Sequence, residues 1–273
     1  RNFARDGFFE YGLFVPALDF PPLTFDPSGA HSDFFPSSAI AAAIMFMLFG
    51  FKLWAARLPV IIVSVLSIPL MFLIVRRLFG RDDMALVAAV LTAINPMFVF
   101  YSHNVDQMPF GLFFVLLSWV LIFKWIDQDK WYFLLGSSFF AGIAVATKYT
   151  YGLMLLPYLA ILPYERLKEW KPRLKTILAA AVLVSLGPGW WFYTSYVVPA
   201  QFGGPAEGGG DTVSLKWLFD AEVYQSAKPY AADNYTLVGV LFAAVGLVLF
   251  LLMRKRFSPM CRRFFITYAC CVP

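Results

Sequence analysis

The sequence predicts an all-α membrane protein, a polytopic bundle of transmembrane helices with about seven complete crossings. Composition is the first reason: 60% of the 273 residues are hydrophobic and 14% are charged, whereas a soluble domain carries about 25% charged residues. The second reason is a series of uncharged apolar runs, most of them near the ~20 residues that a helix needs to cross ~30 Å of hydrocarbon. These runs are Leu58–Val75, Met84–Ser102, Met108–Phe123, Thr176–Val198 and Asn234–Met253.

Clusters of positive charge predict how the crossings are oriented. Lys and Arg concentrate in cytoplasmic loops, and four clusters hold 15 of the 22 basic residues. The clusters are Arg76, Arg77 and Arg81; Lys124 and Lys130; the five basic residues within 166–175; and the five within 254–263. If all four lie in the cytoplasm, the segments 1–57, 101–107 and 199–233 lie outside.

The segment Trp131–Tyr164 needs a different interpretation because Lys148 lies near its middle. As one helix it would be ~51 Å long at 1.5 Å per residue, which is too long for one crossing. One crossing would also place the basic residues of 166–175 outside. Two short crossings that turn near Lys148 satisfy both constraints, and they leave the Lys148 ammonium at the outer surface, where it is hydrated.

The sequence divides into two regions. Residues 1–57 are an extracytoplasmic first loop with short amphipathic or juxtamembrane helices, because the apolar stretch Ser37–Phe49 is only ~20 Å long as a helix. Residues 58–273 form the transmembrane domain, with an external loop at 199–233. The chain opens at Arg1 without a methionine and stops inside an apolar run, so we expect a piece of a longer protein.

The sparse ionisable side chains outside the basic clusters gather at the predicted outer surface. A transporter more often buries such groups near the midplane, at broken helices. An enzyme acting on the head group of a lipid substrate would place them at one interface instead. The residues concerned are His31, Asp33, Arg57, His103, Asp106 and Lys148.

Several motifs occur in an order that resembles a known family. "AARLP" and "RRLFG" stand at the two ends of one predicted helix, and "NPMFVFYS" ends the next, all within residues 51–102. "GIAVATKYTYGLMLLP" (142–157) contains a Thr-Lys turn, "GPGWWFY" (187–193) a Trp-Tyr segment, and residues 31–50 lead from a histidine through prolines and aromatics to Leu-Phe-Gly. Over roughly residues 1–200 the chain resembles the GT-C glycosyltransferases, which include the dolichyl-phosphate-mannose protein mannosyltransferases, the aminoarabinose transferases and the Rgt-like sugar transferases.

The resemblance implies an inverting transfer of one sugar from a polyprenyl-phosphate carrier to a lipid, glycan or protein acceptor on the extracytoplasmic face of the plasma (inner) membrane. A carboxylate takes the proton of the acceptor hydroxyl, and basic residues stabilise the lipid phosphate as it leaves. The partners are therefore the lipid-linked donor, membrane lipid and the acceptor, without nucleic acid. Residues 199–233 lack histidine, so no metal or other cofactor is predicted.

Five residues are the candidate site. Asp33 and Asp106 are the candidate catalytic carboxylates, with the principal base expected upstream of Arg1, and His31, Arg57 and Lys148 are the candidate substrate-binding residues. Each also has a structural interpretation: His31 and Asp33 as part of a proline-rich turn, Arg57 as a helix anchor, Asp106 as a helix cap and Lys148 as a lysine that snorkels to the interface.

Two other functions are compatible with such a sequence. A relative of the same class could transfer a whole oligosaccharide, and a transporter or flippase could move lipid-linked sugars across the bilayer. The chain could also be a fragment without activity of its own. A transporter predicts ionisable groups at mid-depth, whereas the apolar runs above carry none.

Overall fold

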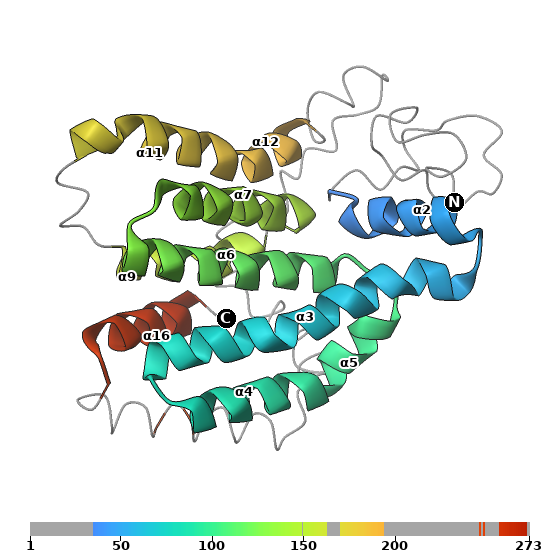
Figure 1. Cartoon of the computed structure of the whole chain (residues 1–273), viewed down its shortest axis with the longest axis horizontal. Helices are drawn as coiled ribbons and strands as arrows, with labels where there is room; N and C mark the ends of the chain where they lie inside the picture. Colours follow the sequence, from blue (N-terminus) through green and yellow to red (C-terminus); the bar gives the residue numbers. More distant parts are fainter. Residues whose placement is uncertain are drawn as a thin grey trace, which may run out of the picture.

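The structure is a computed structural model that describes residues 35–148, 150–162, 170–193, 246, 248 and 257–271. All regular elements in these ranges are helices (Figure 1), which confirms the all-α class. The helices are α2 (Ser37–Phe49), α3 (Leu53–Phe79), α4 (Asp82–Ile94), α5 (Pro96–His103), α6 (Met108–Gln128), α7 (Trp131–Thr147), α8 (Tyr151–Leu155), α9 (Pro157–Ile161), α11 (Trp170–Val184), α12 (Leu186–Phe192) and α16 (Pro259–Cys271).

Two helices, α3 and α6, are long and apolar enough to cross a membrane, and α4 with α5 makes a third span if the bent pair counts as one. Helix α7 is apolar but shorter than the ~20 residues that a full crossing needs. The part of the chain that the structure describes therefore supports two or three of the seven predicted crossings. The crossing predicted over Asn234–Met253 and the external loop at 199–233 lie outside the described residues.

Apolar side chains face outward on the candidate spans. Leu66 of α3 is 46% exposed, and Val87 and Leu91 of α4 are each 58% exposed. A contiguous apolar exterior is unfavourable in water but is the normal surface of a helix that contacts lipid. The outward faces therefore agree with a membrane protein.

The segment predicted as one crossing, Met84–Ser102, is two helices joined at Asn95. Helices α4 and α5 meet at an angle of 55°. Pro96 causes the break, because proline lacks an N–H and disfavours helical geometry in the residue before it. Asn95 is accordingly extended (φ −62°, ψ 121°), and its side chain accepts a hydrogen bond from the Phe98 N–H at 3.1 Å and so caps α5.

The basic residues of two turns, the α3–α4 turn and the α6–α7 turn, lie together at one end of the bundle, which we call the basic end. Helix α3 ends there and α4 begins, and α6 ends there and α7 begins (Figure 1). A bidentate ion pair between Arg77 and Asp127 joins the two turns, with Arg77 Nε 2.9 Å from Asp127 Oδ2. This shared end is the arrangement that the positive charges of Arg76, Arg77, Arg81, Lys124 and Lys130 predicted, although which side of the membrane it faces remains a prediction.

The predicted turn near Lys148 is confirmed. Helix α7 ends at Thr147, and the chain reverses so that α8 and α9 return along α6, with α9 packed against α16. Helix α11 packs on the other side of α7, where Gly142 allows close approach, because a Cβ there would lie 2.2 Å from the Leu183 carbonyl oxygen. The turns before α6 and after α7 thus lie at the end opposite the basic end (Figure 1).

The core is held by aromatic packing and one buried polar cluster between α6, α7 and α9. Trp119 contacts the ring of Tyr158 edge-on, with 4.3 Å between centroids. Ser118 Oγ donates to the Ser137 carbonyl at 2.7 Å, Ser137 Oγ donates to the Ser118 carbonyl at 3.0 Å, and Tyr158 Oη donates to Ser118 Oγ at 2.5 Å. The hydroxyls satisfy one another, as buried polar groups must in an apolar interior.

Candidate functional site

Asp106 lies in the turn that leads into α6. Its Oδ1 accepts a hydrogen bond of 2.7 Å from the Met108 N–H at the helix start, so the capping interpretation is correct as geometry. The side chain is half-buried. The other oxygen, Asp106 Oδ2, has no hydrogen-bond partner among the described residues, so it can accept a further hydrogen bond.

Lys148, in the turn after α7, also contacts Met108. Its backbone closes the last turn of α7, and its Nζ lies 3.6 Å from the thioether sulfur of Met108. Sulfur is a weak acceptor, and an ammonium has three donors. No described carboxylate forms an ion pair with Lys148, since the pairs join Arg76 to Asp82, Arg77 to Asp127 and Arg81 to Asp83.

Tyr151, in the first turn of α8, completes this arrangement. Its hydroxyl donates a 2.7 Å hydrogen bond to the Met108 carbonyl oxygen, and its ring fills the space above Gly111, where a Cβ would lie 2.1 Å from the ring. Sequence reasoning missed Tyr151, because the partner of its hydroxyl is a backbone carbonyl.

A pocket of about 450 Å³ lies beside these residues, between α3, α4, α5, α6 and α8. Most of its lining is apolar, with the polar side chains of Thr92, Asn95, Tyr101 and Tyr151 among it. The volume is within the ~300–1,000 Å³ range of small-molecule sites. Met108 lines the pocket and contacts both Asp106 and Lys148, although neither of these two residues lines the pocket itself.

The other predicted residues are placed less closely or lie outside the described residues. Arg57 is exposed in the first turns of α3, and no hydrogen bond or ion pair among the described residues joins it to Asp106 or Lys148. His103 ends α5, and its Nδ1 lies 2.8 Å from the Val99 carbonyl, as expected of a hydrogen-bonded interfacial histidine. His31 and Asp33 lie outside the described residues.

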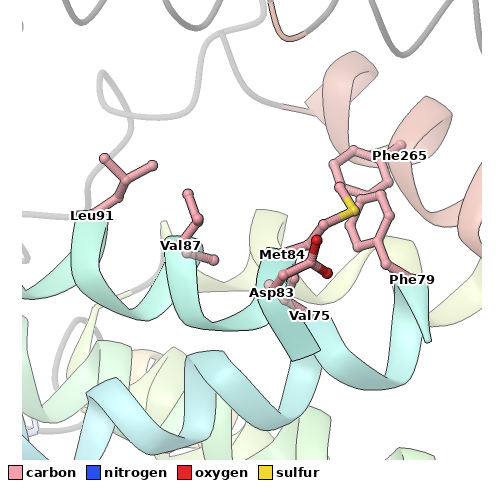
Figure 2. A pocket seen from close by; sticks show the side chains of 8 residues that line it. Val75, Phe79, Asp83, Met84, Val87, Leu91 and Phe265 are labelled. Atoms are coloured by element: carbon pink, nitrogen blue, oxygen red, sulfur yellow. The ribbon is translucent and has the colours of Figure 1, made fainter. Parts of the chain in front are cut away.

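A second hollow, of about 370 Å³, lies nearer the basic end between α3, α4 and α16. Figure 2 shows its lining, with Val87 and Leu91 of α4 along one side and Phe79 and Phe265 at the other. Its carboxylate, Asp83, is engaged by Arg81. None of the predicted site residues lines it. Within the described ranges no group of three or more His, Cys, Asp or Glu side chains could hold a metal ion.

Together the fold and the site define a class of protein. The apolar helices carry basic residues at one end. At the other end, Met108 contacts the Asp106 carboxylate and the Lys148 ammonium and also lines a pocket. This is a multi-helix membrane protein with a candidate polar site at one end of its helices.

Comparison with known proteins places the chain in a family. Residues 33–191, more than half of the chain, match the family model described as dolichyl-phosphate-mannose-protein mannosyltransferase, and the chain belongs to this GT-C glycosyltransferase family. The match includes four of the candidate residues, Asp33, Arg57, Asp106 and Lys148.

Curated relatives agree with the family. The chain is 32% identical over 146 residues to the "Putative mannosyltransferase YkcB" of Bacillus subtilis, covering 51% of this chain and 20% of the relative. It is 27% identical over 172 residues to the "Putative mannosyltransferase YycA" of the same organism, covering 61% and 25%. It is also 27% identical over 169 residues to an uncharacterized protein of Aquifex aeolicus, covering 60% and 33%. The chain thus spans a fifth to a third of these relatives, and no solved structure matches it.

Proposed function

We propose that the protein transfers one sugar from a polyprenyl-phosphate carrier to an acceptor on the extracytoplasmic side of the plasma membrane. The observation that carries this proposal is the convergence of Asp106 and Lys148 on Met108, at the end of the bundle opposite the basic end. Because basic residues favour the cytoplasm, this site faces outward. The family membership supports a sugar transfer, and the two relatives named as mannosyltransferases favour a hexose.

The chemistry that we propose needs two charged groups. The acceptor oxygen attacks the anomeric carbon, and its proton passes to a carboxylate, for which Asp106 Oδ2 is available. The bond between the anomeric carbon and the phosphate oxygen breaks, and the leaving polyprenyl phosphate takes the electron pair. The Lys148 ammonium stabilises the negative charge that develops on this phosphate. Inversion at the anomeric carbon follows from a single displacement.

Three further residues have proposed parts. Asp33 assists as a second carboxylate, and His31 and Arg57 bind the donor phosphate or its sugar. Residues 1–57 would then form an extracytoplasmic first loop, followed by a transmembrane domain in which further segments, including Asn234–Met253, complete about seven crossings.

A transporter of lipid-linked sugars is the second candidate, and the break between α4 and α5 favours it, because broken helices mark the binding sites of many transporters. Against it, the described spans carry no Asp, Glu, Lys or Arg over residues 58–75, 84–102, 108–123 or 131–147. Transporters commonly place such groups at mid-depth.

The test uses membranes that contain the full-length protein and a radiolabelled polyprenyl-phosphate sugar. We expect label to appear on an acceptor, and we expect Lys148→Gln to lower the transfer rate about 10–100-fold, the value of one charge-assisted hydrogen bond. Lys130→Gln, at the basic end, is the matched control and should leave the rate unchanged. Movement of intact donor across the bilayer without transfer would instead establish the transporter.

A further inference from the structure

We propose that the hollow between α3, α4 and α16 binds one acyl chain of an anionic phospholipid, whose head group lies at the basic end. We call this hollow of about 370 Å³ the α4 groove, because five of its eight lining residues belong to α4. None of the eight has a part in the proposed sugar transfer, and the groove begins at the end of the bundle opposite Asp106 and Lys148. The lipid site is therefore independent of the proposed function.

The α4 groove follows its helix away from the basic end. Asp83, Val87 and Leu91 recur every four residues and so lie on one side of α4, where Figure 2 shows them in a row. From Asp83 to Leu91 the helix rises ~12 Å at 1.5 Å per residue. One leaflet contributes ~15 Å of the ~30 Å hydrocarbon core. The groove therefore accommodates most of the length of one acyl chain.

The lining of the α4 groove suits a hydrocarbon chain. Seven of the eight lining side chains are apolar, and the exception, Asp83, already accepts a hydrogen bond of 3.0 Å from Arg81 Nε. A sugar or a peptide would leave its polar groups without partners there, at a cost in free energy, whereas an acyl chain has no such groups. Val87 and Leu91 are each 58% exposed, so the described residues leave this side of α4 largely open to the acyl chains of a membrane.

Positive charge without an acidic partner lies where the groove begins. The arginines at the end of α3 and before α4 each form an ion pair with an aspartate. Helix α16 also begins at the basic end (Figure 1), and its two arginines, Arg262 and Arg263, form no ion pair with any described residue. An anionic head group would balance this charge, as in other basic pockets between membrane helices. A zwitterionic head group would not.

Arg262 is the residue that would hold the head group. It precedes Phe265 by three residues, so the two side chains are neighbours on α16. Phe265 packs against Phe79 in the wall of the groove, with 5.3 Å between the ring centroids. The Arg262 Nε is buried and has no hydrogen-bond partner among the described residues. A buried donor without a partner is costly, and a phosphate oxygen would satisfy it through a charge-assisted hydrogen bond. With the phosphate at Arg262, the acyl chain would extend along α4 away from the basic end.

The test compares two photoreactive lipids. The probes are a phosphatidylglycerol and a phosphatidylcholine that carry the same diazirine in one acyl chain, each added to the full-length protein in phosphatidylcholine nanodiscs. Mass spectrometry should find the phosphatidylglycerol crosslinked to peptides that contain residues 75–91 or 265. Phosphatidylcholine should label these peptides about fivefold less, the preference that one arginine near a head group provides. Equal labelling would overturn the proposal, because the groove would then hold ordinary bilayer lipid. So would the absence of labelling by both lipids, because another segment of the protein or a second copy would then cover the groove.

Two pairs of variants test the acyl chain and the head group separately. Val87→Trp narrows the groove and should lower its labelling by phosphatidylglycerol severalfold, whereas Leu86→Trp, 60% exposed on the same helix but outside the lining, should leave it unchanged. Arg262→Gln should remove the preference for phosphatidylglycerol without changing the labelling by phosphatidylcholine, whereas Lys130→Gln, in the α6–α7 turn, should preserve the preference. Wild-type labelling of Val87→Trp, or a full preference in Arg262→Gln, would contradict the site. Because labelling needs no sugar donor, the result does not depend on whether the protein transfers a sugar.

Discussion

Met108 is the residue on which the side chains of the candidate site meet. Its N–H is held by Asp106, its carbonyl by Tyr151 and its thioether by Lys148. The first two bonds use the backbone, so the position of the α6 start relative to α8 depends on them and not on the identity of residue 108. The third brings a cation next to that start.

The charge of Asp106 can be separated from its capping role by one substitution. Asp106→Asn keeps an acceptor oxygen for the Met108 N–H, since Asn and Asp cap helices about equally well. We expect normal folding but a loss of transfer of about 100-fold or more, the usual contribution of a general base. Transfer rate and thermal unfolding of the purified variant are the measurements, and wild-type transfer by the variant would leave Asp106 with capping alone.

A substitution at Gly111 tests how the Tyr151 ring packs against α6. A Cβ at this position would lie 2.1 Å from the Tyr151 ring, whereas at Gly189 it would meet nothing within 4 Å. Gly111→Ala should therefore destabilise the protein by about 1–3 kcal/mol, as overpacking does, and Gly189→Ala should be neutral or slightly stabilising. Thermal unfolding in detergent compares the two, and equal midpoints would argue against the placement of Tyr151.

At this scale the sequence indicated the charged members of the candidate site but not the tyrosine. Asp106 and Lys148 stand out because ionisable residues are rare in apolar surroundings. Tyr151 does not, because tyrosine is common at membrane interfaces, and the partner of its hydroxyl is a backbone carbonyl 43 positions away. A backbone partner cannot be recognised from residue types, because every residue has a carbonyl group.

Helix ends and breaks control how the elements of this protein meet. Asn95 and Pro96 divide one predicted crossing into α4 and α5, and that division provides one wall of the pocket. The apolar run predicted a helix there but not its bend, because hydropathy counts residues and is insensitive to a missing N–H. The turn after Thr147 was predictable, since length and the Lys148 charge both required it.

The buried cluster of Ser118, Ser137 and Tyr158 gives a prediction at the scale of helix packing. Ser118→Ala removes the group that accepts from Tyr158 and leaves its buried hydroxyl unpaired, so we expect a loss of about 1–2 kcal/mol. Tyr158→Phe removes the donor itself, leaves the bonds between the serines intact and should cost less. Thermal unfolding in detergent shows which variant is less stable. A larger loss of stability in Tyr158→Phe than in Ser118→Ala would contradict the hydrogen-bond pattern.

The whole molecule is organised by the separation of its charges. Arg77 and Asp127 tie the basic end together, and Asp106 and Lys148 lie at the opposite end. Positive charge predicted this polarity because it orients every helix by the same rule. The number of crossings could not be fixed in the same way, since short helices such as α7 and the segments beyond the described residues leave it open.

The measurement that tests this polarity most directly is labelling of single cysteines by a membrane-impermeant maleimide, in a full-length protein whose native cysteines are replaced by alanine. Val105→Cys and Thr150→Cys lie in exposed positions beside Asp106 and Lys148, and Lys130→Cys lies at the basic end. We predict that the first two react in intact cells and that the third reacts only after permeabilisation. If positions 105 and 150 react from opposite sides of the membrane, the site that joins Asp106 to Lys148 does not exist.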